Sequence, residues 1–537
     1  MLCCSTISIS KASLKKGYPS NRPIPNSLFT TACKIFASQH AIIQIVQSTL
    51  SVRPTVNQSP MGSEIAKTEF SEEDFRQFHQ NLRKETRILM EWFSSDIFDN
   101  HQEMCGFELE AWLVDQHCDP TARNEEFLKR VNNPLVVPEL SKYNFELNIA
   151  PHPLDRHLPE FLNRELQKLW NLCAINARDM GCNTLLTGIL PTLKDRMLTL
   201  KNISSLKRFH ALNREILRSI SRHPIKIHIE GKNDSLEVIH HDVMAEAATT
   251  SLQIHFQVPI SRAATVYNIA HVLSAPMAAL TANSPFLFGR ELWDETRIPL
   301  FEQAVKTPAF VDLSGRAVSR VTFGRDYVRK SLKEVFLENL DGFPVLLPVT
   351  FDENFSRLNH LRLHNGTIWR WNRPLIGFGE DGRPHVRIEH RVPPAGPSIP
   401  DIIANILFFY GAILHLQPEV PQAAISFEQA RTNFYAAARI GLEAMLTWTS
   451  GNLVPVDTLL LQQLIPGAMQ ALGERGIERH DLQFYLGDIL TKRVATRRNG
   501  AWWQKTFIRK HGPDFSAMTR AYLENQKKNI PVHEWSI

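Results

Sequence analysis

The sequence predicts an α+β fold built on a largely antiparallel sheet. Helical and strand patterns mix along the 537 residues without the regular strand–helix alternation of a parallel α/β fold. Four segments alternate apolar and polar residues, which is the pattern of a strand with one face in the core. From residue 399 onward the pattern is mostly helical, which indicates a helical region after the sheet.

The individual elements follow from local signals. Ser71 is a suitable N-cap for the first helix, and Gly181 is suited to end another. Strands are expected at 106–115, 143–154, 183–191, 250–260 and on both sides of a glycine turn within 366–398. Helices are expected at 71–95, 125–133, 161–181, 263–282 with an interruption at Pro276, 399–416, 426–449, 456–475, 481–493 and 513–527.

Composition is that of an ordinary globular protein, with 43% apolar and 21% charged residues. The net charge of +5 is misleading, because six of the 60 Lys and Arg residues and none of the 55 acids lie in 1–63. The rest of the chain is nearly neutral and has no basic run with aromatics, so we expect no nucleic-acid partner. The apolar run from Asp401 contains Asn405 and is too short for a membrane span, which favours a buried helix.

Residues 1–63 are rich in Ser, contain no acid and resemble a transit peptide. The alternative, which we favour, is an over-long start with the ordinary sequence beginning at Met61; disorder is expected in either case. A secretory signal is not indicated. The later cysteines have no C-x-x-C spacing, which predicts reduced thiols in a cytoplasm rather than a zinc site or disulfides. They are Cys105, Cys118, Cys173 and Cys182.

One face of each alternating strand carries an unusual set of polar side chains. The ordinary alternative for a single strand is a solvated face, which would be rich in Lys, Thr and Ser. Here the polar positions hold carboxylate, amide, imidazole and guanidinium groups, and no Lys is among them. In chain order they are Glu108, Glu110, Glu146, Asn148, Gln253, His255, Gln257, Arg387, Glu389 and Arg391.

These residue types suit a hard divalent cation together with an anion. Carboxylates with a few nitrogen or amide ligands favour Mg²⁺ or Mn²⁺, whereas zinc prefers cysteine and more histidine. Arginines beside acids on one strand suit an anionic ligand that a metal bridges, such as a polyphosphate. The combination indicates a nucleotide-dependent transferase or ligase.

Other motifs are interpreted as structural. "GFGEDG" (377–382) matches G-x-G-x-x-G but leads into a strand rather than a helix, so it predicts a hairpin turn. "HHDVMAE", with His240, His241, Asp242 and Glu246, could offer metal ligands, but a polar loop and helix start is the favoured interpretation. Arg290 and Arg297 are expected in surface salt bridges, and the aromatic residues Trp502 and Trp503 are expected to pack rather than reach a site.

Taken together, these segments resemble the glutamate–cysteine ligase family of the second type, carboxylate–amine ligases related to glutamine synthetase. "GFELEAWLVD" resembles the family's G-x-E-x-E strand, "NFELNIAPHPL" its second acidic strand and "TSLQIHFQV" its Gln/His strand. "ALTANSPFLFGR" resembles the A-N-S-P-F helix end, and "VRIEHRVPPAGPS" the E-x-R strand. "HNGTIWRWNRP" and "ENQKKNIPVHEW" are similar to a less characterised bacterial branch, which leaves the amine acceptor open.

The resemblance implies a curved antiparallel sheet closed into a partial barrel, with helices outside and the active site on the concave face, like a glutamine synthetase catalytic domain. It implies that ATP phosphorylates the side-chain carboxylate of glutamate or a similar acid, and that an amine then displaces phosphate. The implied Mg²⁺ ligands (Mn²⁺ is the alternative ion) are Glu108, Glu110, Glu146, Gln253 and Glu389. The residues implied for ATP or catalysis are Gln253, His255, Arg370, Arg373, Arg387, Glu389 and Arg391.

This interpretation divides the chain into a leader (1–63), a catalytic domain (64–420) and a helical C-terminal region packed on it (421–537). The expected partners are a small amino acid and an amine, with no membrane, and a homo-oligomer is left open. Two alternatives remain: a protein on a ligase scaffold that binds nucleotide and metal without catalysis, and a phosphotransferase of the same fold.

Overall fold

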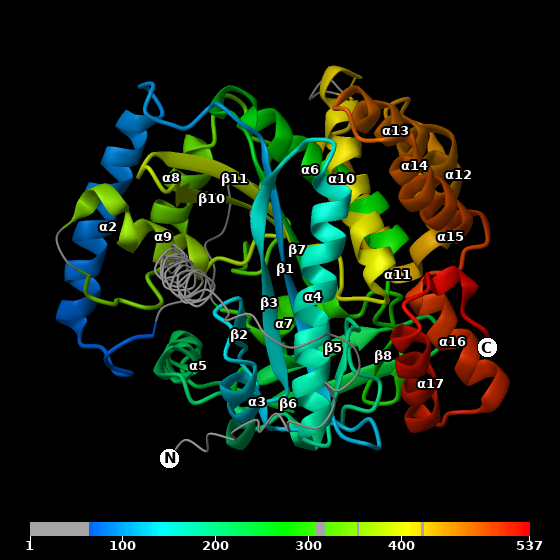
Figure 1. Cartoon of the computed structure of the whole chain (residues 1–537). Coiled ribbons are helices and arrows are strands. Elements are labelled where there is room, and N and C mark those ends of the chain that lie inside the picture. Colours follow the sequence, from blue (N-terminus) through cyan, green and yellow to red (C-terminus); the bar gives the residue numbers. More distant parts are fainter. Residues whose placement is uncertain (1–63, 308–316, 352–353, 420–423) are drawn as a thin grey trace, which may run out of the picture. The chain divides into compact units, whose positions relative to one another are not determined.

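The computed structural model describes residues 64–307, 317–351, 354–419 and 424–537. The described residues all belong to one compact unit. The expectation for the leader, residues 1–63, lies outside the described residues. Within the described residues, strands and helices mix as an α+β fold (Figure 1), which confirms the predicted fold class.

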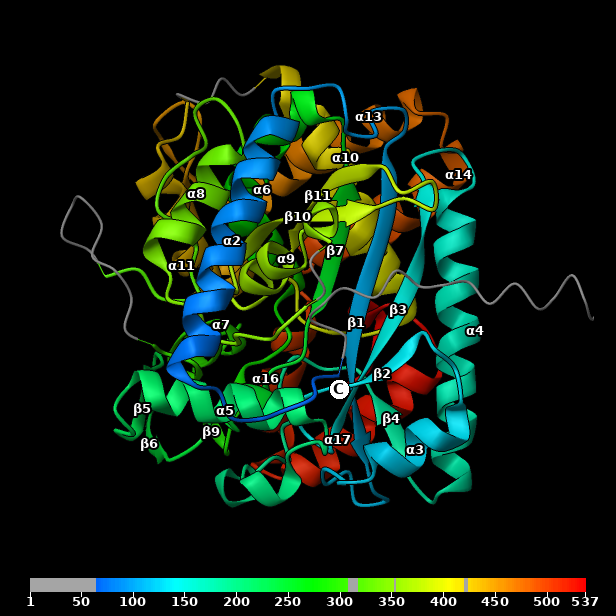
Figure 2. The same cartoon turned by 90° about the vertical axis from the view of Figure 1, so that its left-hand side faces the viewer.

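A curled sheet of seven strands forms the centre of this unit, and every pair of neighbouring strands in it is antiparallel (Figures 1 and 2). The strand order is β10-β11-β7-β1-β3-β2, and β4 pairs with β1 outside this path. The strands are β1 (Met104–Val114), β2 (Val136–Pro138), β3 (Asn144–Pro153), β4 (Asn183–Leu185), β7 (Leu252–Gln257), β10 (Asn372–Phe378) and β11 (Pro384–His390).

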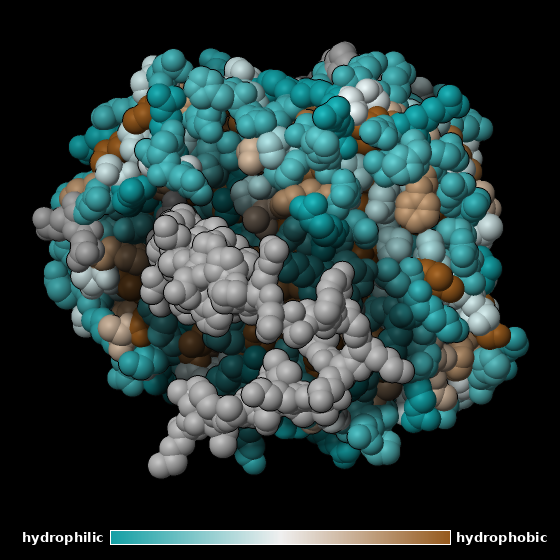
Figure 3. Space-filling model, viewed as in Figure 1, coloured by the Kyte–Doolittle hydropathy of each residue, from teal (hydrophilic) through white to brown (hydrophobic). Residues whose placement is uncertain are grey.

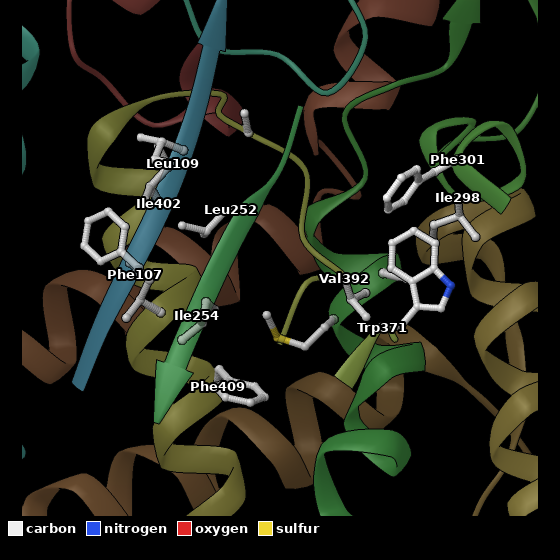
Figure 4. Close-up of a cluster of buried hydrophobic side chains, with 14 of the residues drawn as sticks. Phe107, Leu109, Leu252, Ile254, Ile298, Phe301, Trp371, Val392, Ile402 and Phe409 are labelled. Atoms are coloured by element: carbon white, nitrogen blue, oxygen red, sulfur yellow. The ribbon is translucent and has the colours of Figure 1, made fainter. Parts of the chain in front are cut away.

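The apolar face of the sheet packs against three helices, α4 (Leu158–Asp179), α6 (Ile260–Thr281) and α10 (Ile399–Glu419). In Figure 4, Phe107 and Ile254 of the sheet lie beside Ile402 and Phe409 of α10, and all four side chains are buried. The hydroxyl of Tyr410 on α10 donates to the carbonyls of Gly106 (3.1 Å) and His255 (2.9 Å). The core therefore fixes the two strands that carry the predicted acids and imidazole.

The polar face looks the other way, toward α2 (Glu72–Trp92), α5 (Lys207–Ser219), α8 (Lys333–Gly342) and α9 (Asn359–Gly366) (Figures 1 and 2). Ser71 caps α2 as predicted: its hydroxyl accepts from the Asp74 N–H, and the Asp74 carboxylate accepts from the Ser71 N–H at 2.7 Å. This capping box fixes where the helix begins.

Two apolar helices are long enough to cross a membrane by composition alone, α6 and α10. Of their most apolar stretches, 89% and 94% lie buried inside the protein. Core helices pass the same compositional test, so the burial accounts for their sequences. This confirms the predicted buried helix after residue 399. Figure 3 shows a largely hydrophilic surface on which hydrophobic residues are scattered.

Several elements differ from the sequence prediction. Helix α6 runs through Pro276 without interruption, because its residues are buried and tertiary packing outweighs the missing N–H. Strand β4 ends at Leu185 rather than at residue 191. The predicted helix 426–449 ends at Ile440, where Gly441 has a positive φ of 54°, and a hairpin follows. Unpredicted short hairpins are β5 (Ile225–Glu230) with β6 (Ser235–His240), β8 (Phe286–Leu287) with β9 (Arg290–Glu291), and β12 (Met445–Thr447) with β13 (Leu453–Pro455).

The C-terminal helices share a core with α10. Arg493 donates to Asp401 on α10 at 2.6 Å, and both are fully buried. Trp503 is buried against Tyr522 and Trp535, which confirms its packing role, and Trp502 is partly buried. The remaining helices are α3 (Asn124–Val131), α7 (Arg297–Ala304), α11 (Phe427–Ile440), α12 (Val456–Leu459), α13 (Ile465–Glu474), α14 (Arg479–Leu482), α15 (Lys492–Ala495), α16 (Gly500–His511) and α17 (Phe515–Lys527).

Candidate active site

Strand register brings the polar residues of the four alternating strands into rows on one face. Glu110 of β1 lies opposite Glu146 of β3, and Glu108 of β1 lies opposite Gln253 of β7. One step along, His255 lies opposite Glu389 of β11, which in turn lies opposite Arg373 of β10. Directly opposed residues are about 5 Å apart at Cβ. Residues as far apart in the sequence as Glu108 and Glu389 therefore meet in one patch.

The first group of candidate metal ligands is Glu108, His255 and Glu389, whose ligand atoms all lie within 4.8 Å of one another. The His255 Nε2 atom lies 3.6 Å from Glu108 Oε1 and 3.5 Å from Glu389 Oε1. This nitrogen is buried and has no hydrogen-bond partner among the described residues. An imidazole nitrogen left open between two carboxylates has the donor set of a divalent cation site.

The second group is Glu110, Glu139 and Glu146, again within 4.8 Å of one another. Burial, followed by the charge of Glu139, raises the pKa of Glu110 to about 7. Burial and the neighbouring carboxylates also raise the pKa of Glu146 well above its ordinary value. Carboxylates this close are not all ionised unless a cation sits between them, so this group also fits a divalent cation.

A fourth carboxylate, that of Glu246, joins the second group. It lines a small cavity together with Glu110 and Glu139, and burial and these two acids raise its pKa well above the ordinary value. The backbone around it is the short turn and 3₁₀ helix that the polar-loop interpretation anticipated. In the same segment, His240 is buried 3.0 Å from Asp195, and His241 is exposed.

A chain of hydrogen bonds links the two groups through Arg391 and Gln253. Arg373 holds Glu389 in a two-pronged ion pair, with Nε at 2.9 Å and Nη2 at 3.0 Å. Arg391 donates to Glu389 at 3.1 Å and to the Gln253 side-chain oxygen, and Gln253 donates to Glu110 at 2.9 Å. Burial opposes ionisation of Glu389, but Arg373 and Arg391 outweigh it and hold its pKa well below the usual range.

The two remaining predicted arginines lie in different places. Arg387 lies on the polar face two residues before Glu389, and its Nε is buried without a hydrogen-bond partner in the described residues. Arg370 instead packs against α8, where it donates to Glu338 and Asn339 at 2.8 Å each. Among the described residues it makes no ion pair with either acidic group.

Sequence reasoning missed several residues near these groups. Glu139 lies just after β2, outside the alternating pattern, and only the register of Val137 opposite Glu146 could have placed it. Arg208 on α5 faces the second group: burial lowers its pKa, while Glu139 and Glu146 raise it. No local sequence signal distinguishes Arg208 from a surface arginine.

Of the two arginines predicted in surface salt bridges, one lies on the surface and the other is buried. Arg290 is exposed and pairs with Asp234 at 3.2 Å, as expected of a surface salt bridge. Arg297 was wrongly placed on the surface: only 2% of its side chain is exposed, and it pairs with buried Glu295 at 3.0 Å. Its Nη2 also donates to the Val392 carbonyl, which ties α7 to the segment after β11. The "GFGEDG" segment is the turn of the β10–β11 hairpin, as predicted.

Three solved structures resemble the chain at a distance. A glutamate–cysteine ligase from Francisella tularensis in complex with AMP is 14% identical over 80% of this chain and 90% of that one, with a TM-score of 0.49. A bifunctional glutathione synthetase from Pasteurella multocida is 11% identical over 82% and 55%, with a TM-score of 0.41. The complex of the ubiquitin-like protein Pup with its ligase PafA is 11% identical over 79% of this chain and 72% of that one, with a TM-score of 0.35. Likenesses this distant say nothing about activity.

The curated proteins give no match. The sequence model of one family, described as glutamate-cysteine ligase family 2, matches residues 104–487. This span contains the whole seven-stranded sheet and both groups of candidate ligands. Because the match covers most of the sequence, the chain belongs to glutamate–cysteine ligase family 2, a family of carboxylate–amine ligases.

Proposed function

We propose that the protein is an ATP- and Mg²⁺-dependent carboxylate–amine ligase that activates the side-chain carboxylate of glutamate, or a similar acid, and joins it to an amine. The observation that carries this proposal is the pairing of two acidic groups with Arg373 and Arg391 on one sheet face. Acids alone would suit a cation, and arginines alone would suit an anion. Together they suit a metal-bound polyphosphate.

Each residue has a role that its position supports. Glu108, His255 and Glu389 would hold one divalent cation, and Glu110, Glu139 and Glu146 a second. A bound divalent cation neutralises phosphate charge that otherwise repels an attacking carboxylate. Arg391, bonded to both Glu389 and Gln253, is placed to stabilise the phosphoryl oxygens.

Arg373 acts differently, because both of its ion-pair contacts go to Glu389. It keeps that carboxylate ionised and in a fixed rotamer, and is therefore a positioning residue. No protein nucleophile is needed, since the acid substrate attacks the γ-phosphate itself and the resulting acyl phosphate then reacts with the amine. Burial raises the pKa of the Cys105 thiol well above its usual value, so this cysteine, the one on β1, is unsuited to such a role.

The proposal also names partners and compartment. The substrates are a small amino acid and an amine. The four cysteines among the described residues are free and buried, which is in keeping with the proposed cytoplasmic location.

Hydroxylamine provides a test that does not require the natural amine, because it traps an acyl phosphate as a hydroxamate. Purified protein should form ADP and hydroxamate from ATP, Mg²⁺ and glutamate. Glu108→Gln, Glu139→Gln and Glu389→Gln should each lower the rate about 100-fold or more, since each removes a ligand charge. Glu237→Gln, at an exposed acid on β6, is the matched control and should keep the full rate.

Two results would contradict the proposal. Nucleotide binding without ADP release, over a broad panel of acids with hydroxylamine, would indicate a binding protein on a ligase scaffold. A stable phosphorylated product with no hydroxamate, identified by mass, would indicate a phosphotransferase. Thermal unfolding of each variant separates loss of catalysis from loss of folding.

A further inference from the structure

The start of helix α9 is capped by a residue of another helix. Its own N-cap position holds Leu358, which has a positive φ of 51° and an apolar side chain. Instead, one carboxylate oxygen of Glu85 on α2 accepts from the Leu361 N–H at 2.8 Å. Leu361 is the third residue of α9, and its N–H is one that a capping side chain usually satisfies. An isolated helix of eight residues is marginally stable at best, so α9 depends on such outside contacts.

The other oxygen of Glu85 holds the same end of α9 through His360. It lies 2.8 Å from the His360 Nδ1 atom, and both side chains are buried. The imidazole ring packs edge-on against Phe78 and Phe351, with each pair of ring centroids 5.1 Å apart. Helices α2 and α9 accordingly lie side by side (Figures 1 and 2). A carboxylate that bonds to both the backbone and a side chain of a helix start leaves that helix little freedom to shift.

The opposite end of α9 holds Arg373. The carbonyl of Gly366, the last residue of α9, accepts from Arg373 Nη1 at 3.0 Å, and the Asn365 side chain donates to the Pro374 carbonyl at 2.9 Å. The other two nitrogens of Arg373 hold the Glu389 carboxylate. Because a guanidinium is a rigid fork, the bond of Nη1 to α9 sets the direction of the other two bonds. The position of α9 therefore sets where the Glu389 carboxylate lies.

These contacts form a continuous path from α2 to a candidate metal ligand. The Glu389 carboxylate lies 3.5 Å from the His255 Nε2 atom, so a shift of Arg373 changes the spacing of the donor atoms. A small divalent cation such as Mg²⁺ demands near-ideal ligand geometry and is sensitive to such a change. Helix α2 precedes residues 104–487, the span that the family model matches. The path therefore begins outside the motifs that identify the family.

We infer that Glu85 is a positioning residue for the cation held by Glu108, His255 and Glu389, and that it acts through α9 and Arg373. The inference rests on the proposed function for the presence of that cation. It adds a residue of α2 whose carboxylate, among the described residues, bonds only to α9. Without Glu85, α9 shifts, and Arg373 either moves with it or gives up its bond to Gly366. Both changes loosen the hold on Glu389.

Mn²⁺ is a suitable probe, because the EPR signal of the free ion gives the number of bound ions and their dissociation constants without any substrate. Wild-type protein should bind Mn²⁺, and Glu389→Gln should remove one bound ion. Glu85→Gln should raise the dissociation constant of that same ion about 10-fold, the lower end of what residues that orient metal ligands contribute. Arg373→Lys should also weaken it, because one ammonium group cannot replace the fork that reaches both Glu389 and the Gly366 carbonyl. In the Arg373→Lys protein, Glu85→Gln should cause no further loss.

Asp401→Asn is the matched control. Asp401 is also buried, and its carboxylate likewise joins a side chain, that of Arg493 at 2.6 Å, to a backbone N–H, that of Val532 at 2.9 Å. Asp401→Asn should lower the melting temperature as Glu85→Gln does and leave Mn²⁺ binding unchanged. Glu85→Asp keeps the charge but is one methylene shorter. It replaces Glu85→Gln if that variant does not fold, and it should weaken Mn²⁺ binding in the same direction.

Three results would overturn the inference and leave the proposed function standing. Mn²⁺ bound as tightly by the folded Glu85 variant as by wild type would limit Glu85 to a role in stability. Equal weakening in Asp401→Asn would assign the effect to general loosening of the core. A further loss from Glu85→Gln in the Arg373→Lys protein would show that Arg373 is not on the path. Wild-type protein that binds no Mn²⁺ would instead overturn the proposed metal sites, and this inference with them.

Discussion

The pKa values of two carboxylates at the site are shifted in opposite directions, and the difference lies in their partners. Glu389 is 1% exposed, yet Arg373 and Arg391 keep its pKa well below the usual range. The pKa of Glu110 rises to about 7, because burial and Glu139 outweigh the charge of Arg391. The ionisation of each carboxylate at the site is therefore set by its charged neighbours rather than by how deeply it is buried.

Glu302 lies away from the polar face of the sheet and tests how burial shifts the pKa of a carboxylate. Burial raises its pKa to about 7 from an ordinary 4.5, although Trp371 and Tyr435 donate to its carboxylate. The folded state therefore keeps a proton that the unfolded chain releases between these values, and stability falls as pH rises through that window. Glu302→Gln cannot ionise, so it should lose less stability than wild type between about pH 5 and pH 8.

Urea unfolding at both pH values, followed by fluorescence, measures this difference. Glu237→Gln serves as the exposed control and should behave like wild type at each pH. Equal losses in wild type and Glu302→Gln would show that Glu302 titrates normally in the folded protein.

Residues on the regular strands could be predicted from the sequence, because period-two alternation states which side chains share a face. Glu108, His255 and Glu389 were found this way, and the structure brings them together. Glu139 and Arg208 could not be found, because a loop and a separate helix bring them to the second acidic group. Their positions depend on how distant segments pack, which no local period encodes.

At the scale of elements, the strands of the sheet other than β2 were predictable for a related reason: each carries a continuous apolar face that matches one core. The short hairpins and the course of α6 were not. Pro276 favours a helix break locally, but buried contacts with α10 and α11 keep the helix intact. The β12–β13 hairpin interrupts what looked like helix because Gly441 adopts a positive φ that ends α11.

Helix α17 braces the segment after β11 through buried hydrogen bonds. The Tyr522 hydroxyl donates to the Leu186 carbonyl at 3.0 Å and accepts from Asn283 at 2.9 Å, and Asn283 also donates to the Ala395 carbonyl at 2.9 Å. Tyr522→Phe leaves these buried groups short of a partner and should lower the free energy of unfolding by about 1–3 kcal/mol.

Chemical denaturation quantifies this loss. Tyr485→Phe is the control, since Tyr485 is also buried but its hydroxyl bonds to no described residue, and it should change stability little. A Tyr522→Phe protein as stable as wild type would mean that the C-terminal helix does not brace this segment.

At the scale of the whole molecule, the core and both acidic groups that the structure describes lie within residues 64–537. A protein that starts at Met61 should therefore melt within about 2 °C of the full chain. Adding Mg²⁺ should raise both melting temperatures equally, because a ligand that binds only the folded state stabilises it by mass action. Differential scanning calorimetry with and without EDTA makes the comparison. A large drop on truncation would assign the first residues to the core.

The alternation of side chains along strand β1 also limits how the length of this strand can change. Its odd-numbered residues from Phe107 to Leu113 belong to the core, and its even-numbered acids, Glu108 and Glu110, belong to the site. Inserting or deleting one residue at its start would exchange the two sets, putting carboxylates into the core and Phe107 and Leu109 onto the polar face. Insertions or deletions in this strand are therefore tolerable only two residues at a time. A change of one residue would destroy the fold together with the site.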